Sequence, residues 1–274
     1  MVKVILEVRW IKTKTALVKS RIYDIDYALN PYVGCQHGCV YCYSRFMSKY
    51  VRERRDWGSY VYVKINLPRI LASEVKKKKP GTVLISSVTD PYQPIEKKYE
   101  ITRRALEILS KTMFKPIIMT KSDLALRDID IIKKISDIEV GYSISTIIPM
   151  FSEILEPSAS PPEKRIKALE IFSRNKVSTF VFIAPFIPYL SEEGINVLFD
   201  MLSQIKIDRV VVDTLNIRYG NIQDLIKSLN KLGFWEKVRE VLASENLFFN
   251  YYSYIKNQLI AKAVRKGLRI YFLF

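Results

Sequence analysis

Cysteine and histidine are scarce in this sequence of 274 residues, which contains three cysteines and one histidine. The cysteines, Cys35, Cys39 and Cys42, all fall within eight residues, so they cannot form a closed set of internal disulfides. A small secreted disulfide framework, which needs spread-out cysteine pairs, is therefore excluded. An auxiliary metal cluster is excluded too, because no thiols remain once these three are used.

Long apolar runs are also absent. No stretch reaches membrane-spanning length, so we expect no bilayer-spanning segment and no membrane partner. The first seven residues break their apolar run with Lys3 and do not have the pattern of a signal peptide. Unpaired thiols without an export signal indicate the reducing cytoplasm.

Acidic residues are outnumbered, with 28 Asp and Glu against 44 Lys and Arg and a net charge of +16. This balance favours a polyanionic partner such as nucleic acid, a nucleotide or a phosphate-bearing substrate. The alternative is the lysine-rich surface of a heat-adapted protein, which the low cysteine and histidine content also suits. Charge alone leaves both interpretations open, and the sequence specifies no oligomeric state.

The spacing of the cysteines, C-x3-C-x2-C, is the most specific feature of the chain. Iron–sulfur clusters are held by thiolates, normally one for each iron. Three thiolates on a [4Fe-4S] cluster leave one iron without a protein ligand, which indicates chemistry on a small molecule. Gly34 and Gly38 allow the tight backbone that such a loop needs.

A Cys3His zinc site using His37 is the competing interpretation, and it predicts a non-catalytic protein that binds zinc and nucleic acid. His37 lies between the first two cysteines, so all four ligands would come from one short loop. Zinc sites usually draw on two separated pairs of ligands, which favours the cluster.

Apolar segments between residues 26 and 214 predict strands that alternate with helices at intervals of roughly 25–40 residues. This pattern predicts parallel βα units in an α/β barrel or a doubly wound sheet, with functional loops at the strand carboxyl ends. We expect an N-terminal leader over 1–25, a barrel domain over 26–215 and a helical extension over 216–274. Predicted strands lie at 82–86, 116–120, 139–145, 177–183 and 209–213, with helices at 66–77, 102–112, 128–135, 161–174 and 192–204 and a further strand at 270–274.

Several short motifs are spread over residues 20–215. They are Tyr27–Cys35, Cys42–Arg45, Val88–Pro94, Thr120–Ser122, Arg127–Asp128, Glu156–Pro157 and Ala184–Pro188. Together they resemble the spore photoproduct lyase-like family, related to DNA repair photolyases, within the radical S-adenosylmethionine (SAM) superfamily. The resemblance implies a partial (β/α)6 TIM-type barrel, a [4Fe-4S] cluster and an external electron donor of the ferredoxin or flavodoxin type. It also implies reductive cleavage of SAM to a 5′-deoxyadenosyl radical.

The resemblance also implies roles for individual residues. Cys35, Cys39 and Cys42 would bind the cluster. Lys121 and Ser143 would approach the methionine carboxylate and the ribose, and Arg165 would add a second positive charge. The backbone at Ala184 and Pro185 would contact the adenine. The methionine amino group would be contacted by residues at the end of the second strand, namely Ser86, Ser87, Thr89 and Asp90.

One departure from the family concerns the hydrogen-atom donor. Spore photoproduct lyase uses an additional cysteine, and this chain has none. Repair of the spore thymine lesion by that route is therefore not expected, and Tyr92 is the candidate donor in its place. A basic run near the cysteines is the preferred phosphate-binding candidate, ahead of the aromatic and basic tail from Phe248 to Arg269. The run comprises Arg45, Lys49, Arg52, Arg54 and Arg55.

Overall fold

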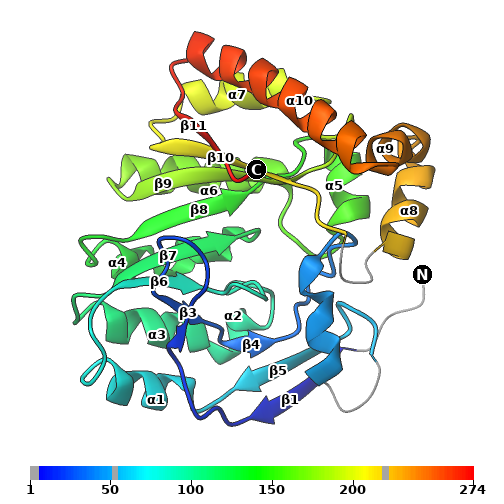
Figure 1. Cartoon of the computed structure of the whole chain (residues 1–274). Coiled ribbons are helices and arrows are strands. Elements are labelled where there is room, and N and C mark those ends of the chain that lie inside the picture. The colour runs from blue at the N-terminus through cyan, green and yellow to red at the C-terminus, as the bar shows by residue number, and fades with distance from the viewer. Residues whose placement is uncertain (1–5, 51–54, 218–221) are drawn as a thin grey trace.

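The structure, a computed structural model, describes residues 6–50, 55–217 and 222–274. Its main element is a curved sheet of eight strands in the order β11-β10-β9-β8-β7-β6-β3-β2, with helices along its outer face (Figure 1). All neighbouring pairs from β3 to β11 are parallel. The strands are β2 (Val18–Lys19), β3 (Tyr27–Leu29), β6 (Thr82–Ile85), β7 (Lys115–Thr120), β8 (Glu139–Ser143), β9 (Ser178–Phe186), β10 (Arg209–Thr214) and β11 (Ile270–Phe272).

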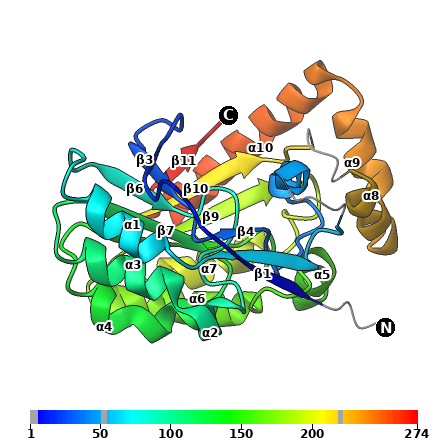
Figure 2. The ribbon, with the colours of Figure 1, turned by 90° about the horizontal axis from the view of Figure 1, so that it is seen from below.

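Six consecutive parallel strands, β3 and β6 to β10, confirm the predicted partial (β/α)6 barrel. Helices connect them on the outer face, as parallel strands require crossover connections. Figure 2 shows these helices grouped on one side of the sheet. They are α1 (Leu67–Glu74), α2 (Glu96–Tyr99), α3 (Ile101–Leu109), α4 (Ile129–Ile132), α6 (Pro162–Arg174) and α7 (Ile195–Ser203), with the 3-10 helix η2 (Asp123–Asp128). Helix α5 (Pro149–Leu155) and the 3-10 helix η1 (Tyr43–Tyr50) lie apart from this group, close to the cysteines.

Both flanking segments pack against the barrel. At the N-terminal side, β1 (Glu7–Ile11) pairs with β5 (Tyr60–Lys64) in a second sheet, whose order is β1-β5-β4 with β4 (Tyr32–Val33). At the C-terminal side, the predicted last strand is confirmed as β11, which pairs with β10. Between β10 and β11 lie α8 (Ile222–Lys231), α9 (Trp235–Leu242) and α10 (Glu245–Arg265).

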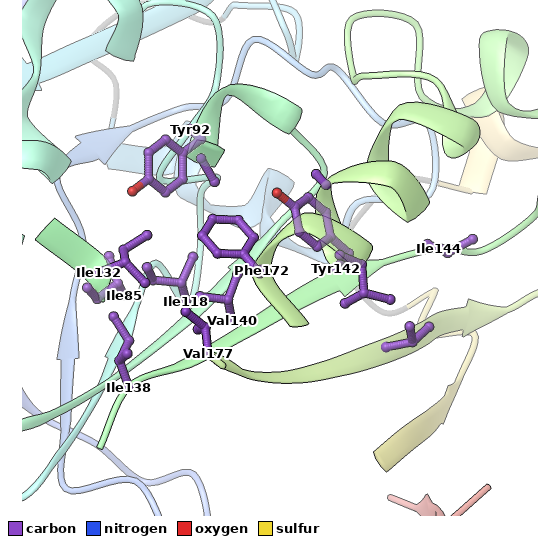
Figure 3. Close-up of a cluster of buried hydrophobic side chains, with 14 of the residues drawn as sticks. Ile85, Tyr92, Ile118, Ile132, Ile138, Val140, Tyr142, Ile144, Phe172 and Val177 are labelled. Carbon is purple, nitrogen blue, oxygen red and sulfur yellow. The ribbon is translucent and has the colours of Figure 1, made fainter. Parts of the chain in front are cut away.

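The two faces of the barrel strands differ in accessibility. Residues that point toward the helices, such as Ile118, Val140 and Val181, are fully buried in the main core (Figure 3). On the inner face, Arg209 pairs with Glu139 and lies 4.7 Å above the ring of Phe180. These three residues lie at the amino-terminal end of the barrel, because they come from the first residues of β8, β9 and β10.

Asn66 and Asp128 precede α1 and α4, but neither side chain caps its helix, since both have other partners. Asn66 accepts a hydrogen bond from Thr13 N and donates one to Thr13 O, at 2.8 and 2.9 Å, so it links the N-terminal segment to the start of α1. Asp128 pairs with Arg103 and Arg127. Among the described residues no helix combines the length and the apolarity that crossing a bilayer requires.

Candidate functional site

The cysteine loop follows β4 and lies at the carboxyl end of the barrel strands. Cys35 and Cys39 are 7% and 6% exposed, and Cys42 is half-buried. Backbone hydrogen bonds between residues three apart shape the loop, from Gly38 N to Cys35 O and from Cys42 N to Cys39 O. Gly34 has a φ of +84°, and a Cβ there would lie 2.4 Å from Tyr60 O, so the loop requires glycine at this position.

The three thiols lie close enough to influence one another. Burial raises the pKa of each thiol, and the charges of Asp90, Cys39 and Cys42 raise that of Cys35 further. Three thiolates in this position therefore need a positive centre among them. An all-thiolate donor set of this kind suits an iron–sulfur cluster.

A single zinc ion suits the loop less well. In the described part of the chain, no three His, Cys, Asp or Glu side chains, the three cysteines included, converge as ligands of one metal ion. His37, the fourth ligand in that interpretation, places Nδ1 2.9 Å from Ser158 O and Nε2 3.3 Å from an Asp90 oxygen. Both ring nitrogens thus face oxygen atoms.

Asp90 anchors the cysteine loop to two barrel strands. Its carboxylate accepts hydrogen bonds from Thr120 Oγ1 at 2.7 Å, from Lys121 N at 2.8 Å and from Tyr92 N at 2.9 Å. Burial alone would raise the pKa of Asp90, but His37 and these hydrogen bonds outweigh it and lower the pKa to about 2. Asp90 is therefore ionised and held in place by the protein itself.

Three of the predicted SAM contacts come together at the ends of β7, β8 and β9. Lys121 Nζ donates to Ser143 Oγ at 2.7 Å, and Ser143 Oγ donates to the carbonyl of Ala184 at 3.1 Å. The charge of Lys121 lowers the pKa of Cys39 and Cys42, against the larger effect of burial. A cationic and hydroxyl-bearing cradle thus lies beside the cysteine loop.

Arg165 lies beside Ser143, but its side chain is engaged by other groups of the protein. It is fully buried, forms an ion pair with Glu156 and donates to Ser143 O at 2.9 Å and Ser160 O at 2.6 Å. Glu156 also accepts from the hydroxyl of Tyr41. Arg165 therefore supports the end of β8 and the cysteine loop from below, instead of presenting a free positive charge.

The hydroxyl residues after β6 have separate tasks. Thr89 Oγ1 donates to Gly34 O at 2.6 Å, and Ser87 N and Oγ are held by the Asn30 side chain. Ser86 has a φ of +72°, and its buried Oγ has no hydrogen-bond partner among the described residues. Ser86 is thus the member of this group whose hydroxyl has unused hydrogen-bonding capacity.

The predicted catalytic role of Tyr92 does not agree with its position. Its ring is fully buried in the main core (Figure 3), and burial together with nearby Asp128 and Glu96 raises the pKa of its hydroxyl. Only its backbone lies beside Asp90. Tyr43 is at the mouth instead, since it directly follows Cys42, is 43% exposed and donates to Ser87 O. Its adjacency to Cys42 is the sequence signal that we missed.

The C-terminal extension covers the cysteine loop, a feature that the sequence did not predict. Figure 1 shows α5, α8 and α9 at the end toward which β8 and β9 point. A second core cluster joins Cys39 and Tyr41 to Leu155 of α5, Leu229 of α8 and Val238 of α9. Water is thereby kept from one side of the loop.

The two predicted phosphate-binding segments are only partly free. Arg45 pairs with Asp224 of α8 and Arg55 pairs with Glu7, while Arg52, Arg54 and the Lys49 side chain lie outside the described residues. In the tail, Tyr252 is buried in the core, whereas Phe249 and Tyr254 of α10 are exposed.

Comparison with known proteins agrees with this arrangement. The model of the radical SAM superfamily matches residues 29–202. An uncharacterized protein of Methanocaldococcus jannaschii is 41% identical over 185 residues, covering 68% of this chain and 70% of that protein. An uncharacterized protein of Acidianus two-tailed virus is 30% identical over 227 residues, covering 78% of this chain and 73% of the viral protein. A radical SAM Nα-GlyT isomerase of a Pseudomonas phage is 24% identical, covering 73% of this chain and 42% of the isomerase.

Solved structures share the fold. Spore photoproduct lyase, complexed with a dinucleoside spore photoproduct, has a TM-score of 0.65 at 16% identity, and the match covers 82% of this chain and 66% of that one. SuiB of Streptococcus suis, bound to its precursor peptide, has a TM-score of 0.59 at 18% identity, covering 90% and 48%. This chain thus spans just under two thirds of the lyase structure and about half of SuiB. From the family match and the shared fold, the chain belongs to the radical SAM superfamily.

Proposed function

We propose that this protein binds a [4Fe-4S] cluster through Cys35, Cys39 and Cys42 and uses it to cleave SAM reductively. The observation that carries the proposal is the position of the three buried thiols beside the Lys121–Ser143–Ala184 cradle, at the open end of the barrel. When bound, such a cluster supplies one electron to SAM, which yields methionine and a 5′-deoxyadenosyl radical that removes a substrate hydrogen.

The protein's own residues bind and orient SAM in this proposal. Lys121 holds the methionine carboxylate, since its ammonium is a mobile point charge with three donors. The Ser86 hydroxyl accepts from the methionine amino group, because among the hydroxyl residues after β6 it is the one whose Oγ has no hydrogen-bond partner in the described part of the chain. Ser143 holds the ribose, and the backbone at Ala184 lies by the adenine.

A second set of residues keeps this site in shape. Thr89, Ser87 and Asp90 fix the loop after β6 through the hydrogen bonds given above, and Arg165 fixes the end of β8. In this proposal these four residues position the groups that bind SAM and do not contact SAM themselves. The second core cluster excludes water from the cysteine loop, which protects a radical from side reactions.

The electron donor that we propose is an acidic carrier of the ferredoxin or flavodoxin type. The family requires an external reductant, and a net charge of +16 attracts an acidic protein by long-range steering. Of the three thiols, Cys42 is the one with the greatest exposure, so the donor would approach on its side of the loop.

A nucleic acid or nucleotide is the substrate class that we favour. The positive charge supports it, as does the likeness to a lyase solved with a dinucleoside. Cleavage of the spore lesion itself is not proposed, because no cysteine remains to donate hydrogen. A zinc protein without catalysis is the weaker alternative, since both nitrogens of His37 face oxygen atoms.

Anaerobic SAM cleavage tests the proposal. Reconstituted protein reduced with dithionite should form 5′-deoxyadenosine slowly without substrate, as measured by chromatography. Cys39→Ala should abolish the product, whereas Lys111→Ala, a change at the opposite end of the barrel, should leave it unchanged. Absence of 5′-deoxyadenosine from fully loaded wild-type protein would contradict the proposal.

A further inference from the structure

Asp213 lies at the mouth of the barrel, near the carboxyl end of β10. Side chains alternate along a strand, so Asp213 shares the inner face with Arg209, which is placed there by its ion pair with Glu139. The register between β10 and β9 shifts between Val212 and Thr214, so that Asp213 lies opposite two residues of β9, Ala184 and Pro185. The charge of Asp213 also contributes, after burial and Cys42, to raising the pKa of Tyr43 to about 12, so Asp213 lies near the cysteine loop.

The Asp213 carboxylate has no ion-pair partner in residues 6–50, 55–217 and 222–274. Its one hydrogen bond there is from Thr214 N to Oδ1, at 2.8 Å. The side chain is half-buried, and burial raises its pKa. A partly desolvated carboxylate with unused acceptor capacity is costly to maintain, and a ligand that donates N–H groups would offset this cost.

The inner face beside Asp213 is apolar and only half-buried. Met119, Phe182 and Val211 are half-buried there, while the alternate residues of the same strands, such as Ile118 and Val212, are fully buried beneath the helices. Strand pairing sets Val211 of β10 opposite Phe182 of β9, and Val211 lies two residues before Asp213 on the same strand. A flat, apolar group with a polar edge would be complementary to this surface.

We propose that Asp213 is a substrate-binding residue that accepts a hydrogen bond from the exocyclic amino group of a nucleobase lying on this inner face. The inference rests on the proposed function and narrows its substrate class. Carboxylates accept from the amino group of cytosine, and adenine and guanine carry similar groups. Thymine has only an N–H flanked by two carbonyl oxygens, which repel a carboxylate. The base would be unstacked from a single strand, as enzymes that act on bases require.

Short thymidine oligonucleotides with one variable central base test the inference. The labelled strands carry thymine, cytosine, adenine or guanine at the centre, and binding to the anaerobically loaded protein is followed by fluorescence anisotropy at one fixed salt concentration. We expect wild-type protein to bind the amino-bearing strands about tenfold more tightly than the all-thymidine strand, as for one hydrogen bond to a charged group. Asp213→Ala should remove this preference, and Asp213→Asn, which keeps one acceptor oxygen, should reduce it.

Asp137→Ala is the matched control. Asp137 is an exposed carboxylate paired with Lys115 at the other end of the barrel, so its loss changes the net charge equally and should leave the preference intact. Equal affinity for all four strands, or a preference that survives in both Asp213 variants, would overturn the inference. So would no binding to any strand, or tighter binding of a lysine-rich peptide. Wild-type cleavage of SAM without oligonucleotide tests the proposed function separately.

Discussion

Replacing Lys121 by alanine should weaken SAM binding without unfolding the protein. Lys121 Nζ lies 2.7 Å from Ser143 Oγ and 5.7 Å from the centre of the Tyr41 ring, beside Cys39 and Cys42. In our proposal it is the cation that holds the methionine carboxylate. No ion pair of Lys121 is found among the described residues, so its removal leaves no buried acid uncompensated there.

The magnitude follows from the lost hydrogen bond. A hydrogen bond to a charged group contributes about 1.5–3 kcal/mol, which corresponds to a rise of roughly 10- to 150-fold in the dissociation constant. Ser143 keeps its bond to the carbonyl of Ala184, so the ribose side of the cradle should stay in place. The loss of affinity should therefore be limited to ligands that carry the methionine carboxylate.

Calorimetric titration of the loaded protein with three ligands checks this reasoning. We expect Lys121→Ala to weaken the binding of SAM and of methionine, with 5′-deoxyadenosine bound as before. Lys111→Ala, which removes a lysine from a surface groove between α1 and α3, is the matched control and should bind all three normally. A SAM affinity within twofold of wild type in Lys121→Ala would refute the assignment, and an equal loss for 5′-deoxyadenosine would mean that the variant disturbs the whole cradle.

Four further changes test the supporting structure. Arg165→Met should lower the free energy of unfolding by about 3–5 kcal/mol in thermal or denaturant melts, because it leaves Glu156 buried without its partner. The depressed pKa of Asp90 stabilises the fold by about 2 kcal/mol above pH 5, and this contribution should be lost as pH falls toward 2 and be missing from Asp90→Asn at all pH values. Tyr92→Phe should retain 5′-deoxyadenosine formation, since the hydroxyl faces the helices. Leu229→Asp should speed the loss of iron in air, followed by absorbance, because it opens the cover over the cysteine loop.

Matched surface variants separate these effects from general damage. Arg174 forms an exposed ion pair with Glu170, so Arg174→Met should change stability by less than about 1 kcal/mol. Leu247 is exposed on α10, and Leu247→Asp should leave the rate of iron loss unchanged. Equal losses of stability in Arg165→Met and Arg174→Met would contradict the role given to Arg165. Equal rates of iron loss in Leu229→Asp and Leu247→Asp would contradict the role given to Leu229.

The sequence predicted those parts of the site that follow from local spacing and strand ends. Three cysteines in one loop indicated the cluster, and the parallel strand pattern brought Lys121 and Ser143 together because carboxyl ends of neighbouring strands share one edge. Parallel pairing has a fixed geometry, so position along a strand is enough to place such residues. Strand ends are therefore the most predictable places in this fold.

Contacts between segments that are far apart in the sequence could not be predicted from it. Tyr92 follows Asp90 closely, but the turn between them directs its ring into the core, and side-chain direction in a loop depends on tertiary packing. Arg165 was predicted to add a second positive charge at the SAM site, and its ion pair with Glu156 becomes apparent only when the two side chains are buried together. The cover by α8 and the exposure of Asp213 likewise depend on how the C-terminal segment returns to the barrel.

The iron and sulfide content of the anaerobically reconstituted protein tests the proposed cluster most directly. We expect about four iron and four sulfide for each chain, with Cys35, Cys39 and Cys42 each required, as three thiolates on a four-iron cluster demand. About two iron for each chain, full loading of Cys39→Ala, or a colourless protein with one zinc would contradict it.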